Sequence, residues 1–349
     1  MEDVLCNISA FGYHRIPPQV LCALPMPAER LDDPTLGTFV EHPLVTEALK
    51  APIHVLSDSR ARNIQGNRLV RHLCSVELPF GSITETDFWF DVASPLFTLL
   101  TLAPYVSNER LIMMMYEFCG SFSVFRVTPE LKRLMLEARG KKAFEPMFGW
   151  SLANAADGSD SLWKRPPLIT VDELRDFAHE VSGLRGAKSF ARAAKCVTGV
   201  AASPLEVQTS MLLSLPRARG GEGIAIENNV KVVLDYGAKL ISNTESRVVD
   251  ILAKNRDASR ECDIECQGQA FHGSVESKIA DSDRTTALQS MGRDVILTTY
   301  GQIADVDAFA EVVKFICTKL GMPYREKSSL QKQREALLRE QIFVNWEAF

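Results

Sequence analysis

Two short apolar runs near the C-terminal end of the chain have the pattern of neighbouring β-strands. The first run, 247–251, carries Asp250 among valine and isoleucine residues. The second run, 262–267, alternates strictly, with one face made of Cys262, Ile264 and Cys266 and the other of Asp263, Glu265 and Gln267. If the chain turns back near Asp257-Ala258, Asp250 lies opposite Glu265 with Cβ atoms roughly 5 Å apart. Carboxylates so placed repel each other unless a divalent cation or a shared proton lies between them, so this pair is the clearest indication of chemistry.

The remaining hydrophobic pattern predicts an α/β fold. Capping signals predict the starts of three helices, at Ser94-Pro95, at the capping box of Thr170 and at Ser203-Pro204. Periodicity predicts further helices at 109–118, 187–197, 276–291, 306–320 and 324–342. Besides the two acidic runs, strands are expected at 53–56, 88–92, 231–234 and 294–299. In the C-terminal half the order of helix, three strands, helix, strand and helix is typical of a mixed sheet flanked by helices.

The length of 349 residues suits two domains of about 100–200 residues each. Residues 1–150 mix β-like runs with helices, which predicts an α+β N-terminal domain of unknown role. The polar, proline-containing residues 151–171 predict a linker. We expect residues 172–325 to form the second domain and residues 326–349 a C-terminal helix.

Composition narrows the classes of protein to consider. The chain is 46% hydrophobic and 24% charged, as in ordinary globular proteins, and no apolar run reaches the roughly 18–20 residues of a membrane span. The acidic N-terminus (MEDVLCNIS) argues against an export signal, and eight cysteines without CxxC pairs argue for reduced thiols and against zinc. We therefore expect a cytoplasmic protein without a membrane partner.

A basic stripe stands out against the net charge of −5. No acid occurs from Val181 to Leu205, and basic residues there follow spacings of three, four and three, at Arg185, Lys188, Arg192 and Lys195. On a helix these four share one face. Such a face can contact phosphates of a nucleic acid, and the alternative is an ordinary solvated helix face.

Several candidate residues have structural explanations as well. Glu206 belongs to a Ser203-x-x-Glu206 capping box, in which its carboxylate bonds back to the Ser203 amide. Asp263 lies near the start of its strand and is expected to be a solvated turn acid. His272 follows the strand in a loop, where it is free to reach a phosphate or to pack on the surface. Arg284 can belong to a solvated helix face.

An ordered set of acidic and basic residues spans 203–303. It consists of Glu206 in an opening helix, Asp250 in a strand (VVDIL), Glu265 in a second strand (IECQG), His272 beyond it, Asp283 and Arg284 in the next helix, and an apolar strand after Gly292. This order resembles the PD-(D/E)xK nuclease superfamily, specifically the branch of very-short-patch repair (Vsr-like) endonucleases. The resemblance implies a restriction-endonuclease-like domain that hydrolyses DNA phosphodiester bonds in defence or repair. More loosely, the N-terminal half resembles a region found with abortive-infection (AbiEi-type) antitoxins.

The resemblance also implies roles for particular residues. Asp250 and Glu265 would bind Mg²⁺ or Mn²⁺, with Glu206 binding a second ion or orienting water. Positioning of the water or the leaving oxygen would fall to Gln267, His272 and Lys278. The basic stripe and Arg284 would contact DNA.

One departure from the family pattern leaves the activity open. The family has lysine or aspartate where this chain has Gln267, which carries no charge and cannot act as a base at neutral pH. The alternatives are a nuclease-fold DNA-binding regulator of low or no activity, or a module that binds only protein. A homodimer, or a partner protein from a defence or toxin–antitoxin system, fits both the nuclease and the DNA-binding regulator. No P-loop, nucleophile elbow or H-E-x-x-H motif offers a different chemistry.

Overall fold

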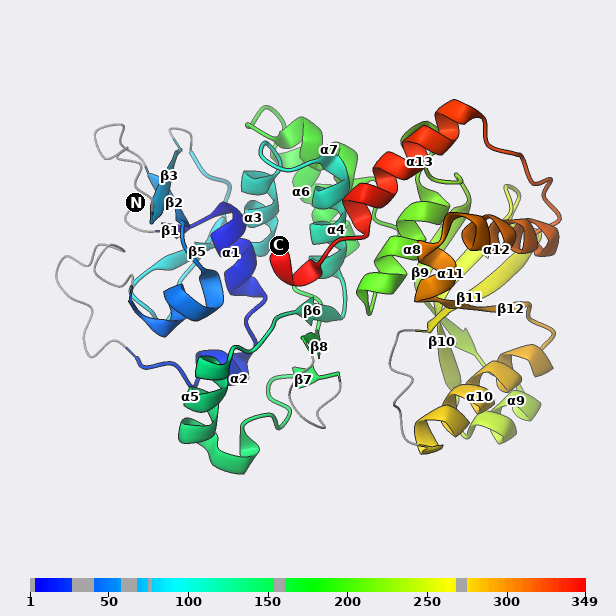
Figure 1. Ribbon diagram of the computed structural model, residues 1–349, viewed down its shortest axis with the longest axis horizontal. Helices are drawn as coiled ribbons and strands as arrows, with labels where there is room; N and C mark the ends of the chain where they lie inside the picture. The colour runs from blue at the N-terminus through cyan, green and yellow to red at the C-terminus, as the bar shows by residue number, and fades with distance from the viewer. Residues whose placement is uncertain (1–3, 27–40, 58–67, 75–76, 154–160, 268–274) are drawn as a thin grey trace. The chain divides into compact units, whose positions relative to one another are not determined.

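The computed structural model describes residues 4–26, 41–57, 68–74, 77–153, 161–267 and 275–349, except the side chains of 275–281. Its contacts divide the chain into two compact units (Figure 1). Unit 1 contains Met1–Lys195 together with Asn345–Phe349, and unit 2 contains Cys196–Val344. Residues 151–171, expected to be a linker, therefore fall within unit 1, as do residues 172–195, which were expected in the second domain. The reason is pairing and packing, because this stretch supplies two strands and two helices to unit 1.

The first sheet of unit 1 has five strands in the order β3-β2-β1-β5-β4. Their bounds are β1 Val4–Leu5, β2 Ile53–Ser57, β3 Leu69–Leu73, β4 Ile83–Thr84 and β5 Asp91–Ala93. The predicted strand at 88–92 is paired only from Asp91 onward. The helical segments described in this part of the sequence are α1 Asn7–His14, α2 Pro18–Leu21, the π-helix η2 Leu44–Leu49 and α3 Pro95–Leu102. Ser94 caps α3 by accepting from the Phe97 amide, as its sequence predicts.

The second sheet of unit 1 is small, with the order β6-β8-β7. Its strands are β6 Phe122–Val124, β7 Ser151–Leu152 and β8 Leu162–Lys164. The other helical segments of unit 1 are α4 Asn108–Cys119, α5 Pro129–Arg139, η4 Gly140–Lys142, α6 Val171–Glu180, α7 Ala187–Ala194 and η6 Trp346–Ala348. The capping box predicted at Thr170 is confirmed, with Glu173 as its second member.

A buried ion pair holds the centre of unit 1. Glu117 is fully buried in α4, and its carboxylate accepts from Arg15 Nε at 2.8 Å and from the Val124 amide at 3.0 Å. Arg15 also donates to the carbonyl of Trp346 at 2.8 Å. Trp346 packs against Phe122 with ring centroids 5.7 Å apart, so the last residues of the chain belong to the core of unit 1.

Unit 2 is built on one mixed sheet in the order β12-β11-β10-β9. The first three strands in sequence pair antiparallel, whereas β12 runs parallel to β11. The strands are β9 Ala225–Val233, β10 Ser246–Lys254, β11 Glu261–Gln267 and β12 Val295–Thr299. The helical segments are α8 Pro204–Ser214, η5 Arg217–Arg219, α9 Tyr236–Ser242, α10 Val275–Ser290, α11 Tyr300–Ala304, α12 Val306–Lys319 and α13 Ser329–Ile342. This confirms the predicted α/β class with a mixed sheet flanked by helices.

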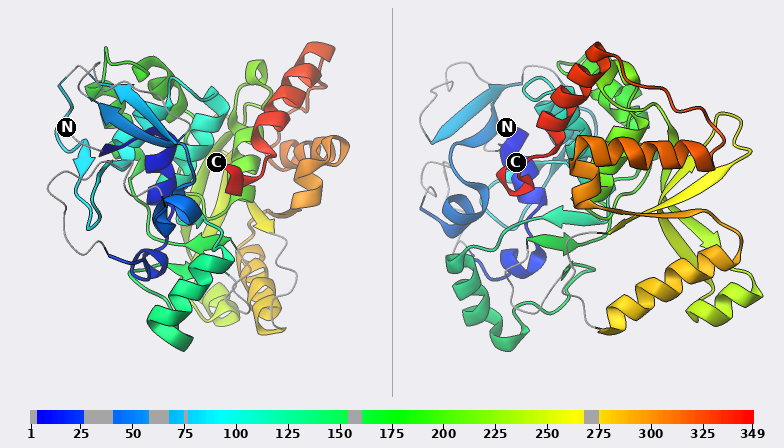
Figure 2. Two further views of the ribbon diagram at one scale, coloured as in Figure 1. Left: turned by 60° about the vertical axis from the view of Figure 1, so that its left-hand side comes forward. Right: turned by 45° about the vertical axis from the view of Figure 1, so that its right-hand side comes forward.

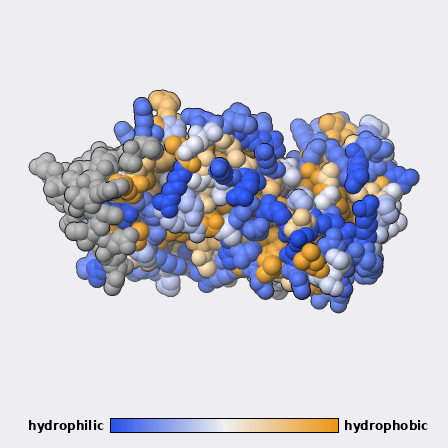
Figure 3. Space-filling view, turned by 90° about the horizontal axis from the view of Figure 1, so that it is seen from above, coloured by the Kyte–Doolittle hydropathy of each residue, from blue (hydrophilic) through white to orange (hydrophobic). Residues whose placement is uncertain are grey.

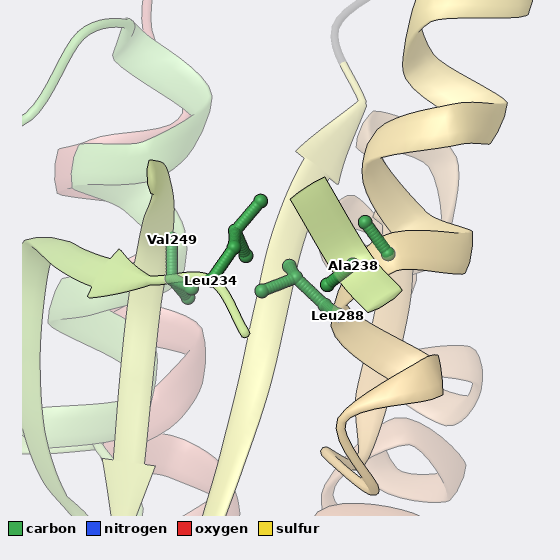
Figure 4. Close-up of a cluster of buried hydrophobic side chains, with 5 residues drawn as sticks. Leu234, Ala238, Val249 and Leu288 are labelled. Atoms are coloured by element: carbon green, nitrogen blue, oxygen red, sulfur yellow. The ribbon is translucent and has the colours of Figure 1, made fainter. Parts of the chain in front are cut away.

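Helices cover both faces of this sheet (Figure 2). On one face α9 and α10 pack together over a cluster in which Leu234 and Val249 meet Ala238 and Leu288 (Figure 4). On the other face α8 contacts three strands, β9, β10 and β11. Strands covered on both sides lose the simple alternation of buried and exposed residues, which is why polar residues of β11 are buried here as well.

The outside of the molecule has the mixed character of ordinary domain surfaces. The face shown in Figure 3 is mainly hydrophilic, with apolar residues scattered among polar ones. Of the helices in the described parts of the chain, none combines the length and apolar character that crossing a membrane requires.

Replacing Glu117 by glutamine should destabilise unit 1. The change removes the charge that balances the buried Arg15 guanidinium, and breaking a buried pair in this way costs about 3–5 kcal/mol. The matched control is Glu130→Gln, because Glu130 pairs with Arg133 on the surface. Thermal unfolding should show a clear fall in the midpoint for E117Q and little change for E130Q. Equal midpoints for the two variants would contradict the structural role of Glu117.

Candidate functional site

The hairpin β10–β11 sets the geometry of the acidic site. Its strands pair in a register that includes Ile251 opposite Ile264, and the same register continued by one residue sets Asp250 opposite Glu265. The chain reverses between Lys254 and Glu261, through a turn in which Ala258 has a φ of 54°. The turn lies where the sequence predicts it, so the expected juxtaposition of Asp250 and Glu265 is found in the structure.

One guanidinium group joins these two carboxylates. Arg284, on α10, places its Nη2 atom 2.7 Å from Glu265 Oε2 and 3.2 Å from Asp250 Oδ1. The same nitrogen donates to the carbonyl of Val248. The second oxygen of Asp250 accepts from the Cys266 amide at 2.9 Å, which ties the carboxylate to the neighbouring strand. The carboxylates of Asp250 and Glu265 thus converge on a single cationic group supplied by the helix.

Glu206 adds a third carboxylate from the first turn of α8. Its oxygens accept from the Ala202 amide at 2.7 Å and from the Ser203 hydroxyl at 2.9 Å. The sequence predicts a bond to the Ser203 amide instead, so the capping role is found but its partner is one residue earlier. Glu206 is buried, and this burial, followed by the nearby charge of Asp250, raises the pKa of Glu206 to about 7.

The pKa of Glu265 is raised further than that of Glu206. Only 7% of the residue is exposed. Burial first, and the charge of Asp250 second, raise the pKa of Glu265 to about 8, while Arg284 acts in the opposite direction. Its Oε1 atom is buried and has no hydrogen-bond partner among the described residues. A buried carboxylate oxygen without a partner is costly, so Glu265 either holds a proton near neutral pH or has a partner still to bind.

The donor set fits a hard cation in its chemistry. All three acidic side chains offer oxygen, the ligand type that Mg²⁺ and Mn²⁺ prefer, and Glu265 Oε1 is available. The arrangement itself is closed around Arg284. Among the side chains that the structure describes, no group of three His, Cys, Asp or Glu residues is placed to hold a metal ion. Binding an ion between Asp250 and Glu265 therefore requires Arg284 to move away.

The structure describes less of the other three residues predicted to take part in catalysis. Gln267 ends β11, is half-buried and pairs in register with Thr299. His272 lies outside the described residues. Lys278 belongs to α10, but its side chain is not among those described. Their predicted roles remain predictions.

Asp263 corrects one expectation. It is 1% exposed instead of solvated, and it pairs with Arg293 through two contacts of 2.6 Å, Nε to Oδ2 and Nη2 to Oδ1. The physical reason is that a two-pronged guanidinium–carboxylate pair compensates the burial of the acid. Asp263 is thus a structural residue that ties β11 to the segment before β12.

The basic stripe belongs to unit 1, and its four residues are exposed. Only Lys188 and Arg192 lie within α7, because Arg185 precedes the helix and Lys195 is its C-cap. The guanidinium of Arg185 lies over the ring of Tyr105, 5.1 Å from its centroid. An exposed basic surface of this kind is compatible with the predicted contacts to phosphates.

A polar chain behind Asp250 was not predicted. Asn228, on β9, accepts from the Thr198 hydroxyl at 2.6 Å and donates to the Ser210 hydroxyl at 2.7 Å. Its neighbour Asn229 has a φ of 56°, and the ladder between β9 and β10 skips the pair of Asn229 and Asp250. The Asn-Asn pair, which precedes the strand expected at 231–234, is the signal that points to this irregularity, because asparagine tolerates left-handed backbone.

Replacing Glu265 by glutamine should change how stability depends on pH. The pKa of Glu265 is raised in the folded state, so the folded protein holds this proton while the unfolded chain has already released it. Stability is therefore lost as pH rises from about 4.5 toward 8. Glutamine does not titrate, so E265Q should lose less stability than the wild type between pH 5 and pH 8. Each kcal/mol of this difference in stability shifts the unfolding midpoint by roughly 2–4 °C.

Thermal unfolding of wild type, E265Q and Glu227→Gln at both pH values measures this difference. Glu227 is an exposed acid of the same sheet that pairs with Lys254, so E227Q should follow the wild type. A pH dependence of E265Q that coincides with that of the wild type would show that the pKa of Glu265 is not raised.

Comparison with protein-family models, with curated proteins and with solved structures finds no match to this chain. No relative therefore contributes to the functional argument, which rests on the geometry of unit 2. The features that any function must account for are the convergence of Asp250 and Glu265, the raised pKa values of Glu206 and Glu265, and the bridging position of Arg284.

Proposed function

We propose that unit 2 is a restriction-endonuclease-like domain whose acidic site hydrolyses DNA phosphodiester bonds with the help of Mg²⁺ or Mn²⁺. The observation that carries this proposal is the convergence of Asp250 and Glu265 from adjacent strands on one cation, Arg284. The order of elements, α8, β9, α9, β10, β11, α10 and β12, supports it, because it presents Glu206, Asp250, Glu265 and Arg284 in the order that the resemblance to Vsr-like endonucleases implies.

The roles of the residues follow from their places. Asp250 and Glu265 would bind the ion, and Glu206 would orient water or hold a second ion. When bound, the ion would lower the pKa of a coordinated water and offset charge on the phosphate. Gln267 would orient this water through a hydrogen bond, since it has no charge to offer. His272 and Lys278 would position the leaving oxygen.

Arg284 would exchange partners when the metal ion and the DNA bind. Its guanidinium now neutralises the two carboxylates that the ion would occupy. Once displaced, it would lie beside the site, where a guanidinium binds phosphate with two parallel hydrogen bonds. One group thus stabilises the acids before binding and the substrate afterwards, and the basic stripe of unit 1 would contact phosphates elsewhere.

A second candidate function is a DNA-binding regulator that retains the nuclease fold without its activity, for example in a defence or toxin–antitoxin system. Two observations favour it. Arg284 already balances Asp250 and Glu265 in the structure. Gln267 stands where the family has lysine or aspartate. If Arg284 permanently occupied the place of the ion, Asp250 and Glu265 would keep their positions but the site would not hydrolyse DNA.

Plasmid nicking distinguishes the two functions. The protein is incubated with supercoiled plasmid and Mg²⁺ or Mn²⁺, beside an Asp250→Ala/Glu265→Ala variant and a Glu227→Ala control. The nuclease should nick, and the double variant should lose roughly 100-fold or more of the rate, as expected when charge stabilisation is removed from a site. The Glu227→Ala control should nick like the wild type. Binding without nicking, with affinity that falls steeply as salt rises, would support the regulator instead.

Calorimetry with Mn²⁺ tests the ligands independently of cutting. Because Glu206 and Glu265 have raised pKa values, the ion must displace protons below pH 8, and affinity should rise by roughly tenfold per pH unit for each proton displaced between pH 6 and pH 8. Arg284→Gln removes the competing guanidinium and should bind Mn²⁺ more tightly. Equal binding by the wild type and the Asp250→Ala/Glu265→Ala variant would exclude these two acids as ligands.

A further inference from the structure

Unit 1 contains a pocket of about 280 Å³ that the proposed function does not use. It lies beside the ends of β2 and β3, against α3 and against the residues that precede α7. Most of its lining is apolar and comes from Leu56, Leu73, Leu78, Phe97, Leu100 and Pro104. At the roughly 30 Å³ that one water occupies in the liquid, this space holds about nine or ten non-hydrogen atoms, the size of a small organic molecule.

His72 and Tyr105 line the polar side of the pocket and belong to a chain of hydrogen bonds that begins at His54. His54 Nδ1 lies 2.8 Å from His72 Nε2, and His72 Nδ1 lies 3.2 Å from the hydroxyl of Tyr105. Burial first, then the charges of His54 and Arg185, lower the pKa of His72 to about 4, so its ring is neutral near pH 7. A neutral imidazole donates from one nitrogen and accepts at the other, so the two bonds run head to tail.

The direction of these hydrogen bonds decides whether the Tyr105 hydroxyl can donate its hydrogen to a ligand. If His54 donates to His72 and His72 donates to Tyr105, the hydroxyl hydrogen of Tyr105 remains available to an acceptor. An anion beside the hydroxyl stabilises this direction, because every dipole in the chain then points its positive end toward the negative charge.

Arg185 supplies a positive charge at the same place. Its side chain lines the pocket, and its guanidinium lies over the Tyr105 ring at 5.1 Å from the centroid. Within the described residues, no carboxylate forms an ion pair with Arg185, and the sequence from Val181 to Leu205 contains no acid. The pocket therefore combines an apolar interior with a cation and a hydroxyl donor at one side.

We propose that this pocket binds a small amphipathic anion, with an apolar body inside the pocket and a carboxylate or similar acidic group between Arg185 and Tyr105. The apolar lining selects the body and Arg185 selects the charge. A DNA phosphate presents no apolar body of this size, so the assignment gives Arg185 a role apart from the basic stripe. The site belongs to unit 1 alone and does not rest on the proposed nuclease function.

Calorimetry with octanoate tests the proposal on the full-length protein. Octanoate has ten non-hydrogen atoms, and we expect a dissociation constant on the order of 0.1–1 mM. The comparison ligands are acetate, which lacks the body, 1-octanol, which lacks the charge, and octylamine, which reverses it. Each should bind at least roughly tenfold more weakly. No octanoate binding, or equal binding of any comparison ligand, would overturn the proposal.

Variants and thiol protection locate the ligand. Arg185→Gln should weaken octanoate binding by roughly tenfold, whereas Arg192→Gln, an exposed arginine of the same stripe, should leave it unchanged. Cys74 lines the pocket, so octanoate should slow its alkylation by iodoacetamide, as followed by peptide mass spectrometry. The exposed Cys22 serves as the internal reference. Equal loss of affinity in both arginine variants, or protection of neither cysteine, would place the ligand elsewhere and overturn the assignment.

Discussion

The guanidinium of Arg284 is the interaction on which the acidic site depends. Asp250 and Glu265 face each other across a hairpin, and Arg284 offsets their repulsion when both are ionised. Because Arg284 sits on α10, the same contact holds this helix against the sheet, one turn before Leu288 enters the apolar cluster beneath it. The charge of the site and the packing of α10 are therefore linked, and whatever draws Arg284 away also loosens one anchor of the helix.

Unit 1 also buries a guanidinium–carboxylate pair, and the contrast is informative. Arg15 and Glu117 are surrounded by fixed partners, including the Val124 amide and the Trp346 carbonyl. Such a pair has one arrangement and serves the fold. At the acidic site the two carboxylates of Asp250 and Glu265 share the single guanidinium of Arg284. Two acids that meet one guanidinium, one of them with a raised pKa, are typical of a site that binds a ligand.

Local patterns account for the elements that the sequence predicts correctly. Ser94, Thr170 and Ser203 each cap the helix expected of them, and the hairpin register follows from strict alternation and a short turn, so Asp250 could be placed opposite Glu265. Tertiary contacts explain the rest. Asp263 resembles a solvated acid until folding brings Arg293 to it, and the bridging role of Arg284 depends on which face of α10 meets the sheet. The short α9 lies in a stretch for which no helix was predicted.

The return of the last five residues to unit 1 has a consequence for biosynthesis. The chain leaves unit 1 after Lys195, forms unit 2, and comes back at Asn345 to add Trp346 to the first core. On the ribosome, the early part of unit 1 must wait for this tryptophan until all of unit 2 has been translated. Unit 1 is thus completed only after unit 2 has been translated, and its Arg15 guanidinium lacks one of its carbonyl acceptors until translation reaches Trp346.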